Sequence, residues 1–424
     1  MDFAEPRKGA PKSANVACPP CATGSAPEEA EHWHTKMCES KASQDLFDAS
    51  VLGDAKAAMK ALVDHGSVNC CNAEGLTSLM MATAGGHADV VRLLVTSGAN
   101  VNAMPSPYGL SALSLAAAQG NVEIVLFLQD WRADPNVGNR RGNAPLTRAA
   151  AAGHCVVCQL LLEMGAAVET MDDAGATALM RAVEAQRLDA AQMLVRLGAS
   201  AVRTDRAGRS TLSRVVDVLL QEEPDVGLQA HSGLLNTQRE RENWTRLCGL
   251  LVDRAADANI VDGMGDTPLS HAVRRGNRAV MLTLLQLGAD IDFPVPSIGG
   301  GTALLQAVLD HRRDLCQTLI TRNASVNMSS ASGLTPLGAA IERGAEELCF
   351  NLIQSGAAFG VRDPRTGETL LMKAAARGLW RLYDHLRPMV ATPALVEGVG
   401  DLPTGVDDDD AEYEYRSSNF EDDP

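Results

Sequence analysis

Aromatic residues are scarce in this chain of 424 residues, and it contains no apolar run long enough to cross a membrane. Phe, Trp and Tyr make up only 4% of the sequence, and a core of Ala, Leu and Val suits thin, closely packed helices. A transmembrane helix needs about 20 consecutive apolar residues, and the N-terminus has no apolar signal region. We therefore expect a soluble protein without membrane insertion, in the cytoplasm, with the nucleus left open.

Motifs of catalysis are also missing. The sequence has no glycine-rich phosphate loop followed by Lys-Ser or Lys-Thr, no H-E-x-x-H and no G-x-S-x-G. His87 and His154 each follow a glycine at the same position of a repeating unit, which favours a structural role. We expect no enzyme activity, no catalytic residue and no cofactor.

A basic field of the kind that binds nucleic acid is absent. The formal net charge is −16, and residues 391–424 alone hold eleven carboxylates against Arg416, a net charge of −10. The other 390 residues carry a net charge of only −6. Because this part of the chain has no excess of positive charge, we do not expect it to bind nucleic acid. We expect an acidic disordered tail at 389–424 and a disordered extension at 1–40.

What the sequence does contain is a repeat of about 33 residues. Nine times a glycine stands four residues before a leucine, and each such glycine is called here the repeat glycine. These are Gly75, Gly109, Gly142, Gly175, Gly208, Gly265, Gly300, Gly333 and Gly367. Self-similarity at this period is typical of a solenoid, whose units bury their apolar faces only by stacking on one another.

Positions counted from the repeat glycine form columns. Leucine fills offset 4 from Leu79 to Leu371, a small residue fills offset 7, and leucine returns at offset 19 from Leu94 to Leu386. Leucines and small residues at this spacing predict two short helices per unit. A glycine after the second helix, as in SGANVNA (97–103), predicts a left-handed helix end followed by a hairpin-like loop.

These residues resemble the ankyrin repeat, whose 33-residue unit carries T-P-L-H-x-A. The best matches are 75–103, GDTPLSHAV (265–273) and GLTPLGAAIERG (333–344), and a T-A-L-M variant stands at 177–180. The resemblance implies an all-α repeat solenoid over residues 41–388, with about ten units and degenerate units at both ends. An insertion at about 221–243 is expected to be a loop or short helix that splits the sixth unit between its two helices.

The resemblance also implies a function and a surface. Ankyrin arrays bind proteins through hairpin tips and the exposed side of the first helix, so we expect a scaffold or adaptor that acts as a monomer. The offsets concerned hold Tyr108, Arg140, Arg141, Asn143, Arg206, Arg209, Arg274 and Arg275, together with Asp173, Glu184, Met264 and Asp266. The mixture of arginine and carboxylate indicates a polar protein surface as the target.

Seven of the ten cysteines fall into two groups. Cys158, Cys248, Cys316 and Cys349 stand at offset 16, where other units have apolar residues, which predicts buried, reduced thiols. Cys18, Cys21 and Cys38 accompany His32 and His34 in a Pro- and Ala-rich segment. A zinc site there remains an alternative to disorder, and no metal ligand is assigned.

Two other functions of the protein also stay open: a regulator controlled by its own acidic tail, and a ubiquitin-ligase-type substrate adaptor.

Overall fold

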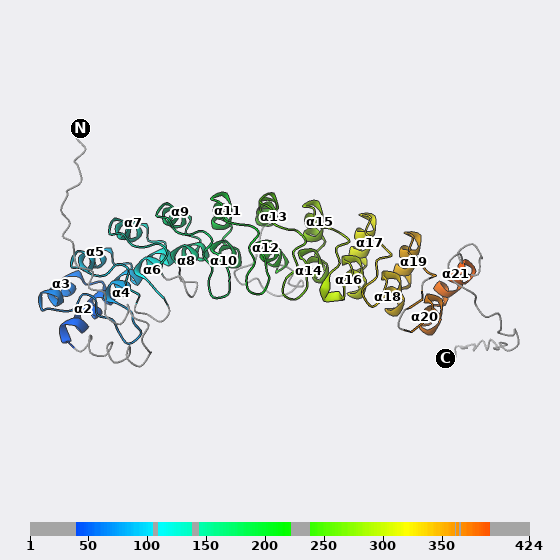
Figure 1. Cartoon of the computed structure of the whole chain (residues 1–424), viewed down its shortest axis with the longest axis horizontal. Helices are drawn as coiled ribbons and strands as arrows, with labels where there is room; N and C mark the ends of the chain where they lie inside the picture. Colours follow the sequence, from blue (N-terminus) through cyan, green and yellow to red (C-terminus); the bar gives the residue numbers. More distant parts are fainter. Residues whose placement is uncertain are drawn as a thin grey trace, which may run out of the picture.

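A computed structural model describes residues 40–104, 109–137, 144–221, 238–360, 362–363 and 366–390. The predicted extension and tail, apart from the residues at their inner ends, lie outside this part of the chain. The described residues form α-helices in consecutive pairs, arranged as an elongated double row (Figure 1). The all-α repeat solenoid predicted from the sequence is confirmed.

In each pair a first helix is followed by a second helix. The first helices are α2 (Lys41–Leu52), α4 (Ser78–Ala84), α6 (Ala112–Gln119), α8 (Pro145–Ala152), α10 (Ala178–Glu184), α12 (Thr211–Leu220), α14 (Pro268–Arg275), α16 (Ala303–Leu309), α18 (Pro336–Glu342) and α20 (Leu370–Ala376). The second helices are α3 (Ala55–Val63), α5 (Ala88–Thr96), α7 (Val122–Asp130), α9 (Cys155–Glu163), α11 (Leu188–Arg196), α13 (Gln238–Asp253), α15 (Arg278–Gln286), α17 (Arg313–Thr321), α19 (Glu346–Gln354) and α21 (Trp380–Val390).

Each row stacks on itself along the array. First helices contact the first helices of the neighbouring pairs, as α10 does with α8 and α12. Second helices likewise contact second helices, as α11 does with α9 and α13. The predicted leucine columns are buried between the rows: Leu161 and Leu194 are fully buried. Leu371 in the last pair is the exception at offset 4, because it is only half-buried while the preceding Leu370 is buried.

Polar residues set the ends of the helices. In most units a Ser or Thr at offset 2 accepts a hydrogen bond from the backbone N–H three residues later, as Thr77 does from Met80 and Ser210 does from Ser213. After the second helix, Gly98 has φ of 94°, so that the predicted left-handed helix end is confirmed there. Isolated antiparallel bridges such as Met171 with Thr177 then close the hairpin loops.

Asparagine side chains tie the loops after consecutive second helices together. Asn69 Oδ1 accepts the backbone N–H of Asn100 at 2.7 Å, one unit further along the chain. Equivalent bonds join Asn102 to Asp134, Asn136 to Ala167, Asn259 to Asp290 and Asn327 to Ala358. The backbone donors of each loop are thus satisfied by its neighbour, which couples adjacent units.

The region of the predicted insertion differs from the expectation. Residues 238–243 do not form part of a separate loop but begin α13, which has 16 residues where most second helices have nine. Trp244 follows directly and is the largest fully buried side chain among the described residues. The remaining residues of the predicted insertion, 222–237, lie outside the described part of the chain.

Candidate interaction surface

The predicted contact residues lie on the hairpin loops and on the first helices, a surface called here the hairpin face. Tyr108, Arg140, Arg141 and Asn143 are outside the described residues. Arg206 in a hairpin loop and Arg275 at the end of α14 are exposed. Arg209 and Arg274 are half-buried and already bind carboxylates of the chain, Asp205 and Asp266. Asp266 itself is buried, so the prediction of an exposed position was wrong for it.

Neighbouring hairpins are joined through their backbones. Arg206 N–H donates to the carbonyl of Ala174 at 2.9 Å, and Gly263 N–H donates to Ala207 at 2.7 Å. The same type of bond joins Ser297 to Gly265 and Ala331 to Gly299. Between Ala174 and Ala331 the hairpin face is therefore an internally bonded surface rather than a row of independent loops.

A carboxylate three residues before the repeat glycine organises each of several hairpins. Asp205 Oδ1 accepts the backbone N–H groups of Ala207 and Arg209 at 2.8 and 2.9 Å. Its other oxygen, Oδ2, accepts Arg214 Nη2 at 2.5 Å and Arg209 Nε at 3.2 Å. One carboxyl group thus fixes the turn with one oxygen and binds a cation of the first helix with the other.

The cation at offset 6 also reaches the preceding unit. Arg214 Nη1 lies 3.2 Å from Glu184 Oε2, at offset 9 of the unit before it. Glu184 also binds Arg181 Nη1 at 2.6 Å within its own unit, and Arg181 Nη2 in turn lies 2.5 Å from Asp172 Oδ2. We call each such set of hairpin carboxylate and offset-6 side chain a rung.

A third rung occurs at the far end of the array. Lys373 at offset 6 binds Asp363 in the hairpin, and its Nζ lies 2.7 Å from Glu342 Oε1 at offset 9 of the preceding unit. Lys373 is largely buried, yet its pKa is raised because Asp363 and Glu342 outweigh the effect of burial. The arrangement around Arg214 is therefore repeated with a different cation.

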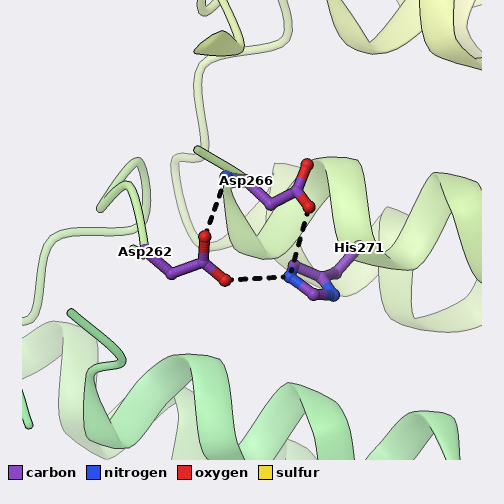
Figure 2. Close-up of side chains that lie close together, drawn as sticks. All are labelled: Asp262, Asp266 and His271. Atoms are coloured by element: carbon purple, nitrogen blue, oxygen red, sulfur yellow. Dashed lines mark hydrogen bonds and ion pairs between the residues drawn. The ribbon is translucent and has the colours of Figure 1, made fainter. Parts of the chain in front are cut away.

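A fourth rung contains histidine in place of a permanent cation. Asp262 occupies the hairpin position, His271 stands at offset 6, and Asp266 at offset 1 approaches the same imidazole (Figure 2). His271 Nε2 lies 3.2 Å from Asp262 Oδ2 and 3.8 Å from Asp266 Oδ2. Asp217, at offset 9 of the preceding unit, is close enough for the charges of His271 and Asp262 to act on its pKa.

The carboxyl groups of the rungs differ in their electrostatics. Burial by itself would raise the pKa of Asp205, but the Arg209 N–H and the Arg214 guanidinium outweigh it and hold that pKa below its ordinary value. The pKa of Asp266 is also below its ordinary value, because the hydrogen bonds from Arg274 and Ser297 outweigh the effect of burial. Burial raises the pKa of Asp217 and outweighs the opposing effect of Arg209 and Arg275.

The offset-6 side chains of the rungs were not predicted from the sequence, although the sequence contains a signal for them. An Asp precedes Arg181, Arg214 and His271 by nine residues, and the pair Asp363 and Lys373 has one residue more. The offsets implied by the family resemblance were −2, −1, 1, 9 and 10, so that offset 6 was not considered. These side chains face the hairpin and the preceding unit, and they stabilise the surface instead of forming its outer contacts.

The predicted burial of the offset-16 cysteines is confirmed. Cys158, Cys248, Cys316 and Cys349 are all buried, and burial raises the pKa of each thiol to about 12. Cys155 is half-buried. His87 and His154 each bring Nε2 to 3.2 Å from a carbonyl of the preceding unit, Val51 and Ala118, which agrees with the structural role predicted for them.

Comparison with known proteins agrees with this geometry. A model of ankyrin repeats matches residues 46–139, 131–205 and 241–330, more than half of the chain. The chain belongs to the ankyrin repeat family. None of the helices among the described residues of this ankyrin protein is both long and apolar enough to cross a membrane.

Individual relatives match only parts of the array. The B-cell lymphoma 3 protein homolog of Mus musculus is 35% identical over 133 residues, 31% of this chain and 29% of that protein. Ankyrin repeat and SAM domain-containing protein 6 of Rattus norvegicus is 35% identical over 108 residues, 25% of this chain and 12% of that protein. Ankyrin repeat and KH domain-containing protein mask of Drosophila melanogaster is 44% identical over 73 residues, 17% of this chain and 2% of that protein. The match therefore spans less than a third of each relative.

Proposed function

We propose that this ankyrin protein is a non-enzymatic scaffold or adaptor that binds a protein partner through the hairpin face. The observation that carries the proposal is the contrast between paired and exposed side chains on that face. Asp205, Arg214 and Glu184 form ion pairs within the array, whereas Arg206 and Arg275 remain exposed. A surface whose framework is fixed in advance loses less entropy on binding.

Apolar contact area is available beside these arginines. Met264 stands at a hairpin tip with 77% of its surface exposed, at one of the offsets that the family resemblance implies for partner contacts. Met and Arg are both enriched in protein–protein interfaces. A groove of about 430 Å³ lies between two hairpins and is lined by Asp173 and Arg206 among others. This mixture of charge and apolar surface supports a folded protein or a peptide of mixed charge as the partner.

The test is affinity capture followed by titration of the captured partner. We expect Arg206→Glu combined with Arg275→Glu to weaken binding at least about tenfold, or about 1.4 kcal/mol. The matched control is Arg246→Glu combined with Arg278→Glu, which reverses two exposed arginines on the second helices α13 and α15. Equal loss in both double variants would indicate an unspecific charge effect and would contradict binding through the hairpin face.

A further inference from the structure

The rung of Asp262 and His271 has the same framework as the other rungs but lacks their permanent cation at offset 6. Arg181, Arg214 and Lys373 occupy this position elsewhere, each within ion-pair distance of a hairpin carboxylate. Here an imidazole, which is not a permanent cation, lies beside two carboxylates of its own unit, Asp262 and Asp266.

Three ligand atoms converge at this rung. One carboxylate oxygen each of Asp262 and Asp266 and a ring nitrogen of His271 all lie within 4.8 Å of one another. Figure 2 shows both carboxylates turned toward the imidazole. Zinc bonds to nitrogen and oxygen of about 2.0–2.2 Å in a tetrahedral site place the ligand atoms about 3.3–3.6 Å apart. His271 Nε2 lies 3.2 Å from Asp262 Oδ2, close to this spacing, and 3.8 Å from Asp266 Oδ2, slightly beyond it.

Each carboxylate is held by its other oxygen. Asp262 Oδ1 accepts the backbone N–H groups of Met264 and Asp266, both at 2.9 Å. Asp266 Oδ1 accepts Ser297 Oγ at 2.5 Å and Ser270 Oγ at 3.3 Å, and it also binds the guanidinium of Arg274. Such secondary hydrogen bonds are what orient metal ligands in proteins.

The remaining oxygen of Asp266 is the least satisfied atom of the cluster. The Asp266 side chain is only 2% exposed, and among the described residues Oδ2 accepts no hydrogen bond, its partner being His271 Nε2 at 3.8 Å. In the rungs of Asp172 and Asp205, by contrast, Oδ2 binds an arginine at 2.5 Å. Since the other oxygen of Asp266 already binds Arg274, Oδ2 is the oxygen of this carboxylate that is available to a metal ion.

We propose that Asp262, Asp266 and His271 bind a divalent transition metal ion of the zinc type on the hairpin face of this ankyrin array. A donor set of one imidazole nitrogen and two carboxylate oxygens suits Zn²⁺ and its neighbours in the series. The ion fills the place that Arg or Lys occupies in the other rungs. It joins the hairpin carboxylate Asp262 to the first helix α14 through His271, and water completes its coordination.

The experiment is equilibrium dialysis of the full-length chain against Zn²⁺, with the bound zinc counted per chain. The parent for all variants carries Cys18→Ser, Cys21→Ser and Cys38→Ser, which removes the thiols of the N-terminal cysteine and histidine segment. His271→Arg places at offset 6 the residue found there as Arg214, so the rung retains a cation but loses the ligand. We expect this variant to bind one zinc ion fewer per chain than the parent.

Two further variants make the result specific. Asp262→Asn keeps the turn, because Asn72 at the same position accepts the N–H groups of Glu74 and Leu76 through Oδ1, but it loses a charged ligand and should also lose the zinc. His154→Arg removes a histidine at offset 12, where Arg187 and Arg312 stand in other units, and should bind as much zinc as the parent.

Thermal melting provides the second measurement. Zinc should raise the melting temperature of the parent and of His154→Arg, and it should leave His271→Arg unchanged. Circular dichroism before zinc addition shows whether each variant is folded. The proposal is overturned if the parent binds no zinc, or if folded His271→Arg and Asp262→Asn bind as much zinc as the parent.

Discussion

Arg214 Nη1 in α12 lies 3.2 Å from Glu184 Oε2 in α10, so that an ion pair joins two consecutive ankyrin units. The same guanidinium binds Asp205 in its own hairpin at 2.5 Å, and both side chains are almost completely buried. Lys373 makes the corresponding pair of contacts with Glu342 and Asp363. These rungs add polar coupling between units to the apolar coupling that the leucine columns supply.

Loss of the buried cation of a rung should be costly. We expect Arg214→Ala to lower the free energy of unfolding by about 3 kcal/mol, because breaking a buried pair leaves an uncompensated carboxylate. Arg209 and two backbone N–H groups still bind Asp205, so the loss should fall at the lower end of the range for such pairs. Urea denaturation measures it. The control is Arg92→Ala, whose pair with Glu123 is exposed and which should change stability by less than about 1 kcal/mol.

The acid stability of the array should depend on Asp205. Its pKa in the folded state lies below the ordinary value of 3.8, so the ionised carboxylate stabilises the folded state above about pH 3.8 and this contribution is lost as the pH falls through the lower, folded-state pKa. Asp205→Asn should therefore be less stable than wild type at neutral pH. The difference should shrink as the pH falls below 3.8. A difference that stays constant across this range in denaturation curves would contradict the ionic role of Asp205.

The offset-16 thiols should react slowly in the native state. Burial raises the pKa of Cys158, Cys316 and Cys349 to about 12, which leaves almost no thiolate near neutral pH, and the thiolate is the reactive form. Mass spectrometry after timed alkylation measures each site. Cys155 is half-buried and serves as the internal comparison, with faster modification expected. Equal alkylation rates at Cys155 and Cys158 would contradict the prediction, because they would mean that α9 unfolds locally often enough to expose the buried thiol.

Trp244 in α13 should contribute strongly to the stability of the array. We expect Trp244→Ala to cost about 3 to 5 kcal/mol, the range for removal of a buried aromatic side chain. Trp131→Ala should cost less than about 1 kcal/mol, because 46% of that residue is exposed. Chemical denaturation of the two variants side by side measures this contrast. Similar losses in both would show that Trp244 contributes little to the core.

The sequence predicted the features of the fold that recur in every unit. Leu161, Leu194 and their equivalents repeat at fixed offsets because each unit must bury the same face, and a column of this kind is visible without a structure. Trp244 was missed because the long interval before it interrupts the columns. The site of Asp262, Asp266 and His271 was missed because its ligands come from a hairpin and a helix, without the spacing of a known metal motif.

The most direct test of the proposed binding surface is hydrogen exchange of the array with and without its captured partner. Binding through the hairpin face should slow exchange in the hairpin residues 201–210 and 258–266 and in the first helices α12 and α14. The second helices α11, α13 and α15, which lie in the other row (Figure 1), should exchange at unchanged rates. Slower exchange confined to α11, α13 and α15 would contradict the assignment of the hairpin face as the partner-binding surface.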